Sequence, residues 1–375
     1  MRRPGRRARE ARADVDFTPT DEQRAAARLA AEIFGDLSTP ERLAALGTSA
    51  DADLWKALCA AGLPGAVEEA GLLGLVLMAE EQGRTTAQVP FAASCAYGLL
   101  AVGAHGSAAQ RARLLPGLRD GTEVAAGAFA RAVGSGGPRP VAAGAPVDSG
   151  RARLSGTVPV VPWLCGATVL LVPDAERRLW LVRADEPGVG VEPVATTAPW
   201  SAGRLTLDGA AAERLGGPGA YHARHAHDDV LAVARTAFAG LQAGVCAGAL
   251  ARAVAHTTTR EQFGRPLATN QGVQLRAAEA YMDTEAIRVT AYEAAWRRDA
   301  GLDAVTHALT AAWWASEAGK RVVHTGQHLH GGIGADLDHP VHRHFLWGRQ
   351  LDAHLGAGAE LLEELGALLT KEPQA

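Results

Sequence analysis

The segment Thr259–Gln271, T-R-E-Q-F-G-R-P-L-A-T-N-Q, separates two long stretches with helical periodicity. Before it, apolar residues recur at i, i+3 and i+4 spacing: Val230, Val233, Ala234, Ala237, Phe238, Leu241 and Val245. After it, three segments of similar length have helical patterns: residues 271–299, 303–329 and 340–368. Asp228 or Asp229 is expected to cap the first helix. Four long helices in succession predict a four-helix bundle.

The first part of the chain, residues 17–125, is also predicted to be helical. Thr20-Asp21-Glu22-Gln23 is a helix start, and Gly62 and Pro64 end the next helical pattern. A further helix is predicted from Leu72 to Arg84, ended by Gly83.

Residues 126–212 differ, because Gly and Pro become dense and short β-branched runs appear. These runs are Val158–Val161, Thr168–Val172, Leu179–Val182 and Arg204–Leu207. Their spacing predicts a small antiparallel β domain, with 133–140 as a loop. Strands do not alternate with helices, which argues against a Rossmann domain. The predicted class is α+β, with a tail (1–16), an N-terminal helical domain (17–125), a β domain (126–212) and a C-terminal bundle (213–375).

Composition excludes several function classes. The chain has 375 residues, 47% hydrophobic, with a net charge of −4, so nothing points to nucleic acid. Six arginines among the first twelve residues predict a solvated, disordered tail; no apolar region follows that would make a signal peptide. The sequence contains no uninterrupted run of about 18 apolar residues, so we expect no transmembrane helix.

The cysteines and histidines show no spacing typical of metal ligands. The four cysteines, Cys59, Cys95, Cys165 and Cys246, are far apart and are interpreted as reduced thiols of a cytoplasmic protein. Two histidine clusters, His222/His225/His227 and His339/His342/His344, are interpreted as solvated or helix-capping residues. We therefore expect no metal site.

Two C-terminal motifs carry a family resemblance. Arg260-Glu261-Gln262-Phe263-Gly264, continued by Leu267 and Gln271, resembles the R-x-x-F-G-x-x-(I/L)-x-x-x-Q signature of the acyl-CoA dehydrogenase family. His328-Leu329-His330-Gly331-Gly332-Ile333-Gly334 resembles its Q-x-x-G-G-x-G signature, with His328 in place of Gln. Glu80-Glu81-Gln82-Gly83-Arg84 is similar to the family's N-terminal helix ending. The resemblance extends from Phe17 to about Leu369 and implies a helical domain, a β-barrel-like domain and a four-helix bundle.

The resemblance implies that FAD is the cofactor and that these motifs bind it. Arg260 would reach the diphosphate of the neighbouring subunit's FAD, since a guanidinium fork matches phosphate oxygens. Phe263 would pack near the cofactor and Gln271 would hydrogen-bond to it, with Gln262, Leu267 and His328 as further signature positions. Gly331, Gly332 and Gly334 would allow close backbone approach.

The chain departs from the family at both known positions of the catalytic glutamate. Aligned on the glycine motif and Pro340, one position falls on Leu355, followed by Gly356 and Ala357. The other falls on Ala234, next to Arg235, which matches an active-site arginine of the family or is a helix charge paired elsewhere. Neither Leu nor Ala can accept the substrate's α-proton. Asp338 and Asp352 are the acids considered as substitutes.

The predicted β domain departs too. The family's T-E-P-x-x-G-S-D loop becomes Ala130–Gly137, and its W-I-T-N segment beside the flavin becomes Val160-Val161-Pro162-Trp163. This pattern resembles one subunit type of actinobacterial α2β2 acyl-CoA dehydrogenases that act on bulky steroid-type thioesters. It implies α,β-desaturation of an acyl thioester together with a catalytic paralogue and an electron-transfer acceptor. Two alternatives remain: a homo-oligomeric flavoenzyme of altered chemistry, acting for example on carrier-bound thioesters, and a scaffold without FAD.

Overall fold

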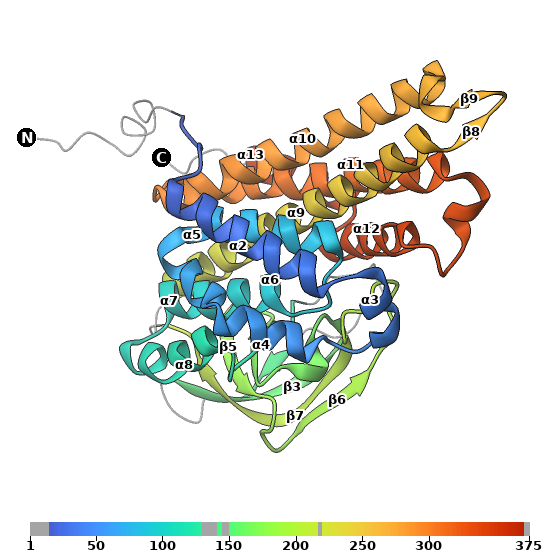
Figure 1. Ribbon diagram of the computed structural model, residues 1–375. Helices are drawn as coiled ribbons and strands as arrows, with labels where there is room; N and C mark the ends of the chain where they lie inside the picture. Colours follow the sequence, from blue (N-terminus) through green and yellow to red (C-terminus); the bar gives the residue numbers. More distant parts are fainter. Residues whose placement is uncertain (1–14, 130–140, 145–149, 217–219, 371–375) are drawn as a thin grey trace, which may run out of the picture.

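The computed structural model describes residues 15–129, 141–144, 150–216 and 220–370, with side chains from residue 225 in the last range. Figure 1 shows a twisted sheet, a group of N-terminal helices beside it and long C-terminal helices on the side away from the sheet. The predicted order of helices, sheet and helical bundle is confirmed. The predicted tail and the loop at 133–140 lie outside the described residues.

Helices of 4 to 23 residues form the N-terminal part: α2 (Asp21–Leu37), α3 (Pro40–Leu46), α4 (Ala52–Ala60), α5 (Leu63–Thr85), α6 (Phe91–Ser94), α7 (Ala101–His105) and α8 (Ala108–Asp120). A π-helical turn, Cys95–Leu100, joins α6 to α7. The helix start predicted at Thr20 is confirmed, because Thr20 and Gln23 form a reciprocal capping box.

The helix boundaries predicted around Gly62, Leu72 and Arg84 are confirmed. Helix α4 ends at Ala60, and α5 begins at Leu63 after Gly62, with Pro64 in its first turn, where a missing N–H costs nothing. Gly71, with φ 70°, interrupts α5 just before Leu72, and α5 ends at Thr85, two residues after Gly83. A Cβ at Gly83 would lie 2.1 Å from the carbonyl oxygen of Leu241. The glycine therefore serves close packing of α5 against the first bundle helix, which local sequence signals do not show.

The sheet is mixed and not purely antiparallel, which corrects the prediction. Its strands are β1 (Ala125–Gly127), β2 (Ala142–Ala143), β3 (Arg151–Val161), β4 (Val169–Pro173), β5 (Leu179–Arg183), β6 (Val189–Pro193) and β7 (Gly203–Arg214). The order is β1-β4-β5-β7-β3-β2, with β6 on β7, and β1 runs parallel to β4. Strands β1, β2 and β6 were not predicted, because they are short and lack a β-branched run.

The bundle contains α9 (Ala220–Thr259), α10 (Gln271–Asp299), α11 (Val305–Leu329), α12 (Val341–Leu355) and α13 (Gly358–Leu369). Asp228 and Asp229 lie inside α9, so neither caps it. The segment predicted as one helix, 340–368, forms two, since Gly356 adopts φ 118° and ends α12. Buried Ala and Val side chains of α9 and α11 dominate the interior, which permits close helix packing.

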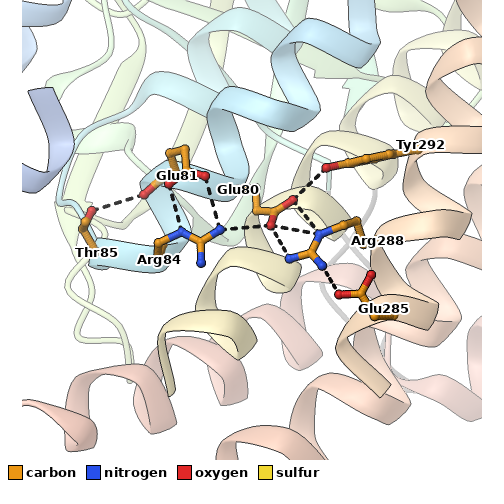
Figure 2. Close-up of polar contacts among 7 residues, drawn as sticks. All are labelled: Glu80, Glu81, Arg84, Thr85, Glu285, Arg288 and Tyr292. Atoms are coloured by element: carbon orange, nitrogen blue, oxygen red, sulfur yellow. Dashed lines mark hydrogen bonds and ion pairs between the residues drawn. The ribbon is translucent and has the colours of Figure 1, made fainter. Parts of the chain in front are cut away.

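One buried carboxylate joins the N-terminal helices to the bundle (Figure 2). The side chain of Glu80 on α5 is 5% exposed and accepts hydrogen bonds from Arg288 and Tyr292 of α10. Arg84 also contacts it, at 3.3 Å. The charge is fully compensated, so this carboxylate has a structural role.

One stretch of the bundle, His225–Thr259, is long and apolar enough to cross a membrane, because it contains an 18-residue window with a mean hydropathy of 1.5. A bent pair, α4 with α5, passes the same test only if both helices count as one span. Of the 18-residue window in His225–Thr259, 83% is buried inside the protein. The apolar character of this helix is therefore explained by its place in the core.

Candidate functional site

The two positions matched to the family's catalytic glutamate line one cavity. Leu355, at the end of α12, and Ala234, on α9, both face a space of about 390 Å³. Aromatic residues form much of its wall. Tyr97 stacks on Phe129 at 5.3 Å, and Phe238 meets His354 edge-on at 4.5 Å between ring centroids. The cavity can thus receive an apolar group, although Leu355 and Ala234 offer it no proton acceptor.

Arg235 lines the same cavity and is engaged by a carboxylate. Its Nη1 and Nη2 lie 2.9 and 2.6 Å from the two carboxylate oxygens of Glu364 on α13. Sequence reasoning missed Glu364 and its neighbour Glu360, which also lines the cavity. The reason is the break at Gly356. A single helix over 340–368 would place these two acids on a different face from the one that the separate helix α13 gives them.

The two acids considered as substitutes for the catalytic glutamate lie elsewhere. Asp352 accepts a hydrogen bond of 2.5 Å from Ser316 and faces α11. Asp338 is exposed in the turn before α12. Neither lines the cavity with Leu355.

The first signature forms an exposed hairpin at the far end of the bundle (Figure 1), with β8 (Glu261–Gln262) paired to β9 (Arg265–Pro266). Phe263 at its tip is 98% exposed, with φ 56°, a conformation uncommon outside glycine. Arg260, Gln262 and Gln271 are exposed, and Leu267 is half-buried. None of these side chains lines the cavity that contains Leu355 and Ala234.

The glycine motif lies next to the hairpin's base. Gly331 has φ 65° and is exposed with Gly332, whereas Gly334 is buried and accepts a hydrogen bond from Gln327 at 3.1 Å. His328 is exposed on α11. The His256 ring of α9 stacks on His330 at 4.7 Å, which joins the two motif-bearing ends. The structure brings both signatures together, but α12, about 20 Å long at 1.5 Å per residue, separates them from Leu355.

These two regions fit FAD differently. The exposed end offers a guanidinium, an amide and accessible glycine backbone, which suits a diphosphate group. On the sheet side, Trp163 is 3% exposed and stacks on Trp200 at 6.4 Å. Trp200 in turn meets Trp347 at 5.7 Å. These indoles fill the interior next to the Val160–Trp163 segment, which does not fit a flavin ring in this arrangement.

The histidine clusters are partly buried, which corrects the expectation of solvated side chains. His227 is 9% exposed and His344 is 1% exposed. Burial lowers the pKa of His344 to about 4, and its Nε2 lies 3.0 Å from the carbonyl oxygen of Arg84. Within the described residues, no group of three His, Cys, Asp or Glu could hold a metal ion. The four cysteines are unpaired.

Known proteins resemble the chain along its length. Two family models match it: the acyl-CoA dehydrogenase N-terminal domain over residues 20–122 and the C-terminal domain over 225–363. It is 35% identical to acyl-CoA dehydrogenase FadE27 of Mycobacterium tuberculosis (strain ATCC 25618 / H37Rv), covering 96% of this chain and 100% of that protein.

Two solved structures are similar as well. The Tcur3481-Tcur3483 steroid ACAD variant is 40% identical, with 94% of this chain and 98% of that chain covered and a TM-score of 0.86. The ChsE4-ChsE5 complex from Mycobacterium tuberculosis is 32% identical, with 96% and 100% covered and a TM-score of 0.87.

Proposed function

The chain belongs to the acyl-CoA dehydrogenase family, and we propose that it is the subunit without a catalytic glutamate in a two-polypeptide enzyme that desaturates an acyl thioester. The observation that carries this proposal is the cavity shared by Leu355 and Ala234. A glutamate at either place would face a bound acyl group, and both places hold apolar side chains. The base is then supplied by a catalytic paralogue.

We propose that this chain contributes residues to an FAD site that it forms together with the paralogue. Arg260, Gln271 and the Gly331–Gly334 turn would bind the diphosphate side of a cofactor seated mainly in the partner subunit. FAD, when bound, supplies the hydride acceptor of the desaturation, and an electron-transfer acceptor is required downstream. The chain's own role is electrostatic and positional, because Arg260 brings a fixed positive charge to the diphosphate.

An exposed apolar stripe on α10 supports assembly with a partner. Leu275, Met282 and Val289 are spaced seven residues apart, so they share one helix face. They are 56%, 63% and 47% exposed. Such an exposed apolar stripe is of the kind that is covered in obligate complexes, and Phe263 is a further exposed apolar side chain on the hairpin before α10.

The similar proteins favour a bulky acyl group and a heteromeric assembly. One is a steroid ACAD and another is a complex of two polypeptides, ChsE4 and ChsE5. We therefore propose a polycyclic, steroid-like acyl-CoA thioester as substrate.

The test is co-expression with a catalytic paralogue from the same genome, with subunit composition, flavin content and turnover measured on the purified complex. We expect a heteromer that contains FAD and desaturates a steroid-like acyl-CoA, whereas this chain purified alone contains little flavin. Met282→Asp should prevent assembly. Val191→Asp, at a residue 38% exposed on β6, is the matched control and should leave assembly intact. A homo-oligomer of this chain with full flavin content would contradict the proposal.

A further inference from the structure

The Arg235–Glu364 pair has the geometry of a carboxylate-recognition site. The Arg235 side chain is 14% exposed and its two terminal nitrogens each meet one oxygen of Glu364. Such fork-to-fork pairing is specific for planar carboxylates. Glu364 itself is 43% exposed. The guanidinium is thus fixed at the cavity, whereas its present partner can turn toward solvent.

The remaining walls suit an apolar body next to that carboxylate. Tyr97, Phe129, Phe238 and Leu361 border the same space as Arg235. Its volume, about 390 Å³, lies within the range of roughly 300–1,000 Å³ typical of small-molecule sites. Arg177, His227, His354 and Glu360 line the cavity as well, so its wall is part apolar and part charged, which suits a ligand that joins an apolar body to a charged group.

Helix α13 need not move for Glu364 to leave. Leu361, one turn earlier on α13, is 1% exposed and holds the helix against the core. The link to α12 is tight, since Gly356 has φ 118° and Ala357 has φ 29°, both unusual conformations. A rotation of the Glu364 side chain is therefore sufficient to free the guanidinium.

We propose that this cavity binds a small organic acid with a ring-sized apolar body, whose carboxylate replaces Glu364 on Arg235. Glu364 acts as an internal competitor that occupies the arginine when no ligand is bound. Every residue of the site belongs to this chain, so the inference stands apart from the proposed pairing with a paralogue. The ligand class also differs from a thioester, because a thioester carbonyl carries no charge for the guanidinium.

The experiment is calorimetric titration of the full-length chain with 4-phenylbutanoate and with its uncharged counterpart, 4-phenylbutanamide. We expect the carboxylate to bind and the amide to bind at least about tenfold more weakly, because it lacks a charge-assisted hydrogen bond. Glu364→Ala should tighten carboxylate binding by about tenfold. Arg235→Met should weaken it by about 10- to 100-fold.

Arg321 provides the matched control, since it also makes a two-bond pair with a carboxylate, that of Asp283 at 2.9 and 2.8 Å, but does not line this cavity. Arg321→Met should leave the dissociation constant within about twofold. Arg235→Lys, which keeps the charge but loses the fork, should also weaken binding and covers the case that Arg235→Met fails to fold. Equal affinity for acid and amide, or unchanged binding after Arg235→Lys or Glu364→Ala, would overturn the inference. Flavin content and turnover are not read in this titration, so its failure leaves the proposed function unaffected.

Discussion

The carboxylate of Glu80 accepts hydrogen bonds from Nε and Nη2 of Arg288, at 3.0 and 2.5 Å, and so joins α5 to α10. Both groups are largely buried, with 5% and 22% of their side chains exposed. Burial works against the charge on Arg288, but the Glu80 carboxylate outweighs it and raises the arginine's pKa. Burial, with Glu80 adding to it, also raises the pKa of Tyr292.

Arg288→Met should therefore destabilise the protein by about 3–5 kcal/mol, because it leaves a buried carboxylate without its main partner. Denaturant unfolding at pH 7 measures this loss. Arg321→Met is the matched control: Arg321 also makes a two-bond pair, with Asp283, but is 51% exposed, so about 1 kcal/mol or less is expected. Equal losses for the two variants would show that Glu80 does not depend on Arg288.

Asp299 of α10 makes a second link to α5, because its carboxylate caps the part of α5 that begins at Leu72. At Gly71, with φ 70°, the helix is interrupted, and the backbone N–H groups of Leu72 and Leu73 donate to the carboxylate of Asp299 at 2.9 and 3.0 Å. Asp299→Ala should lower the free energy of unfolding by about 0.5–2 kcal/mol, as for loss of an N-cap. Asp185→Ala is a suitable control for thermal or denaturant unfolding, because the Asp185 carboxylate is 83% exposed and lies 3.6 Å from Arg183. A loss no larger for Asp299→Ala than for Asp185→Ala would contradict the capping role.

The sequence predicted the elements whose signals are local and left out those that depend on distant partners. The Thr20 start was readable because Gln23 lies three residues away. The cap at Leu72 could not be predicted from the sequence, because the acceptor of its N–H, Asp299, is 227 residues away. Gly83 was interpreted as a helix end, although its role is contact with Leu241 of α9. In the same way, Leu355 and Ala234 could be assigned by alignment, whereas Glu360 and Glu364 required the actual direction of α13.

The buried imidazole of His344 predicts a loss of stability in mild acid. Its pKa is lowered by burial from 6.5 to about 4 in the folded chain, so the unfolded chain binds a proton first as pH falls. Its contribution is intact above about pH 6.5 and is lost as pH falls through 4, by about 3 kcal/mol in total. Urea unfolding at pH 7, 5.5 and 4 should show this decline, and His344→Gln should flatten it. His328→Gln, at an exposed position on α11, should keep the wild-type slope; a flat wild-type profile would contradict the assignment.

Arg260 should matter for cofactor retention in the assembled enzyme and not for the fold of this chain. Its side chain is exposed after α9. Its backbone N–H donates to the carbonyl oxygen of His256 at 2.8 Å, and its carbonyl oxygen accepts from the N–H of Leu267 at 2.9 Å. Arg260→Ala in the heteromer should weaken FAD binding by about 1.5–3 kcal/mol, the size of a charge-assisted hydrogen bond. Flavin absorbance after gel filtration, at unchanged thermal stability of the isolated subunit, measures this effect. Arg265→Ala, on the same hairpin but bonded to Asn270 at 3.0 Å, is the control. Unchanged flavin occupancy would show that Arg260 is misplaced.

The isolated chain should be inactive as an acyl-CoA dehydrogenase. Leu355 and Ala234 cannot accept a proton, and loss of a positioned general base costs about 10²–10⁴-fold in rate. Glu364, which does line the cavity, is poorly placed to act as a base, since both of its carboxylate oxygens accept hydrogen bonds from Arg235. Asp352 is bonded to Ser316 and Asp338 is exposed in a turn.

The assay uses homogeneous chain reconstituted with FAD and a panel of straight, branched and steroid-like acyl-CoA thioesters, with the heteromer as the positive control. We expect turnover only from the heteromer, and Asp338→Asn, Asp352→Asn and Glu360→Gln in this subunit should each leave its rate within about threefold of wild type. Rapid turnover by this chain alone, abolished by one of these substitutions, would identify that acid as the base. The chain would then be a homo-oligomeric flavoenzyme with a relocated carboxylate, because a base supplied by a partner cannot be lost through a substitution in an isolated subunit.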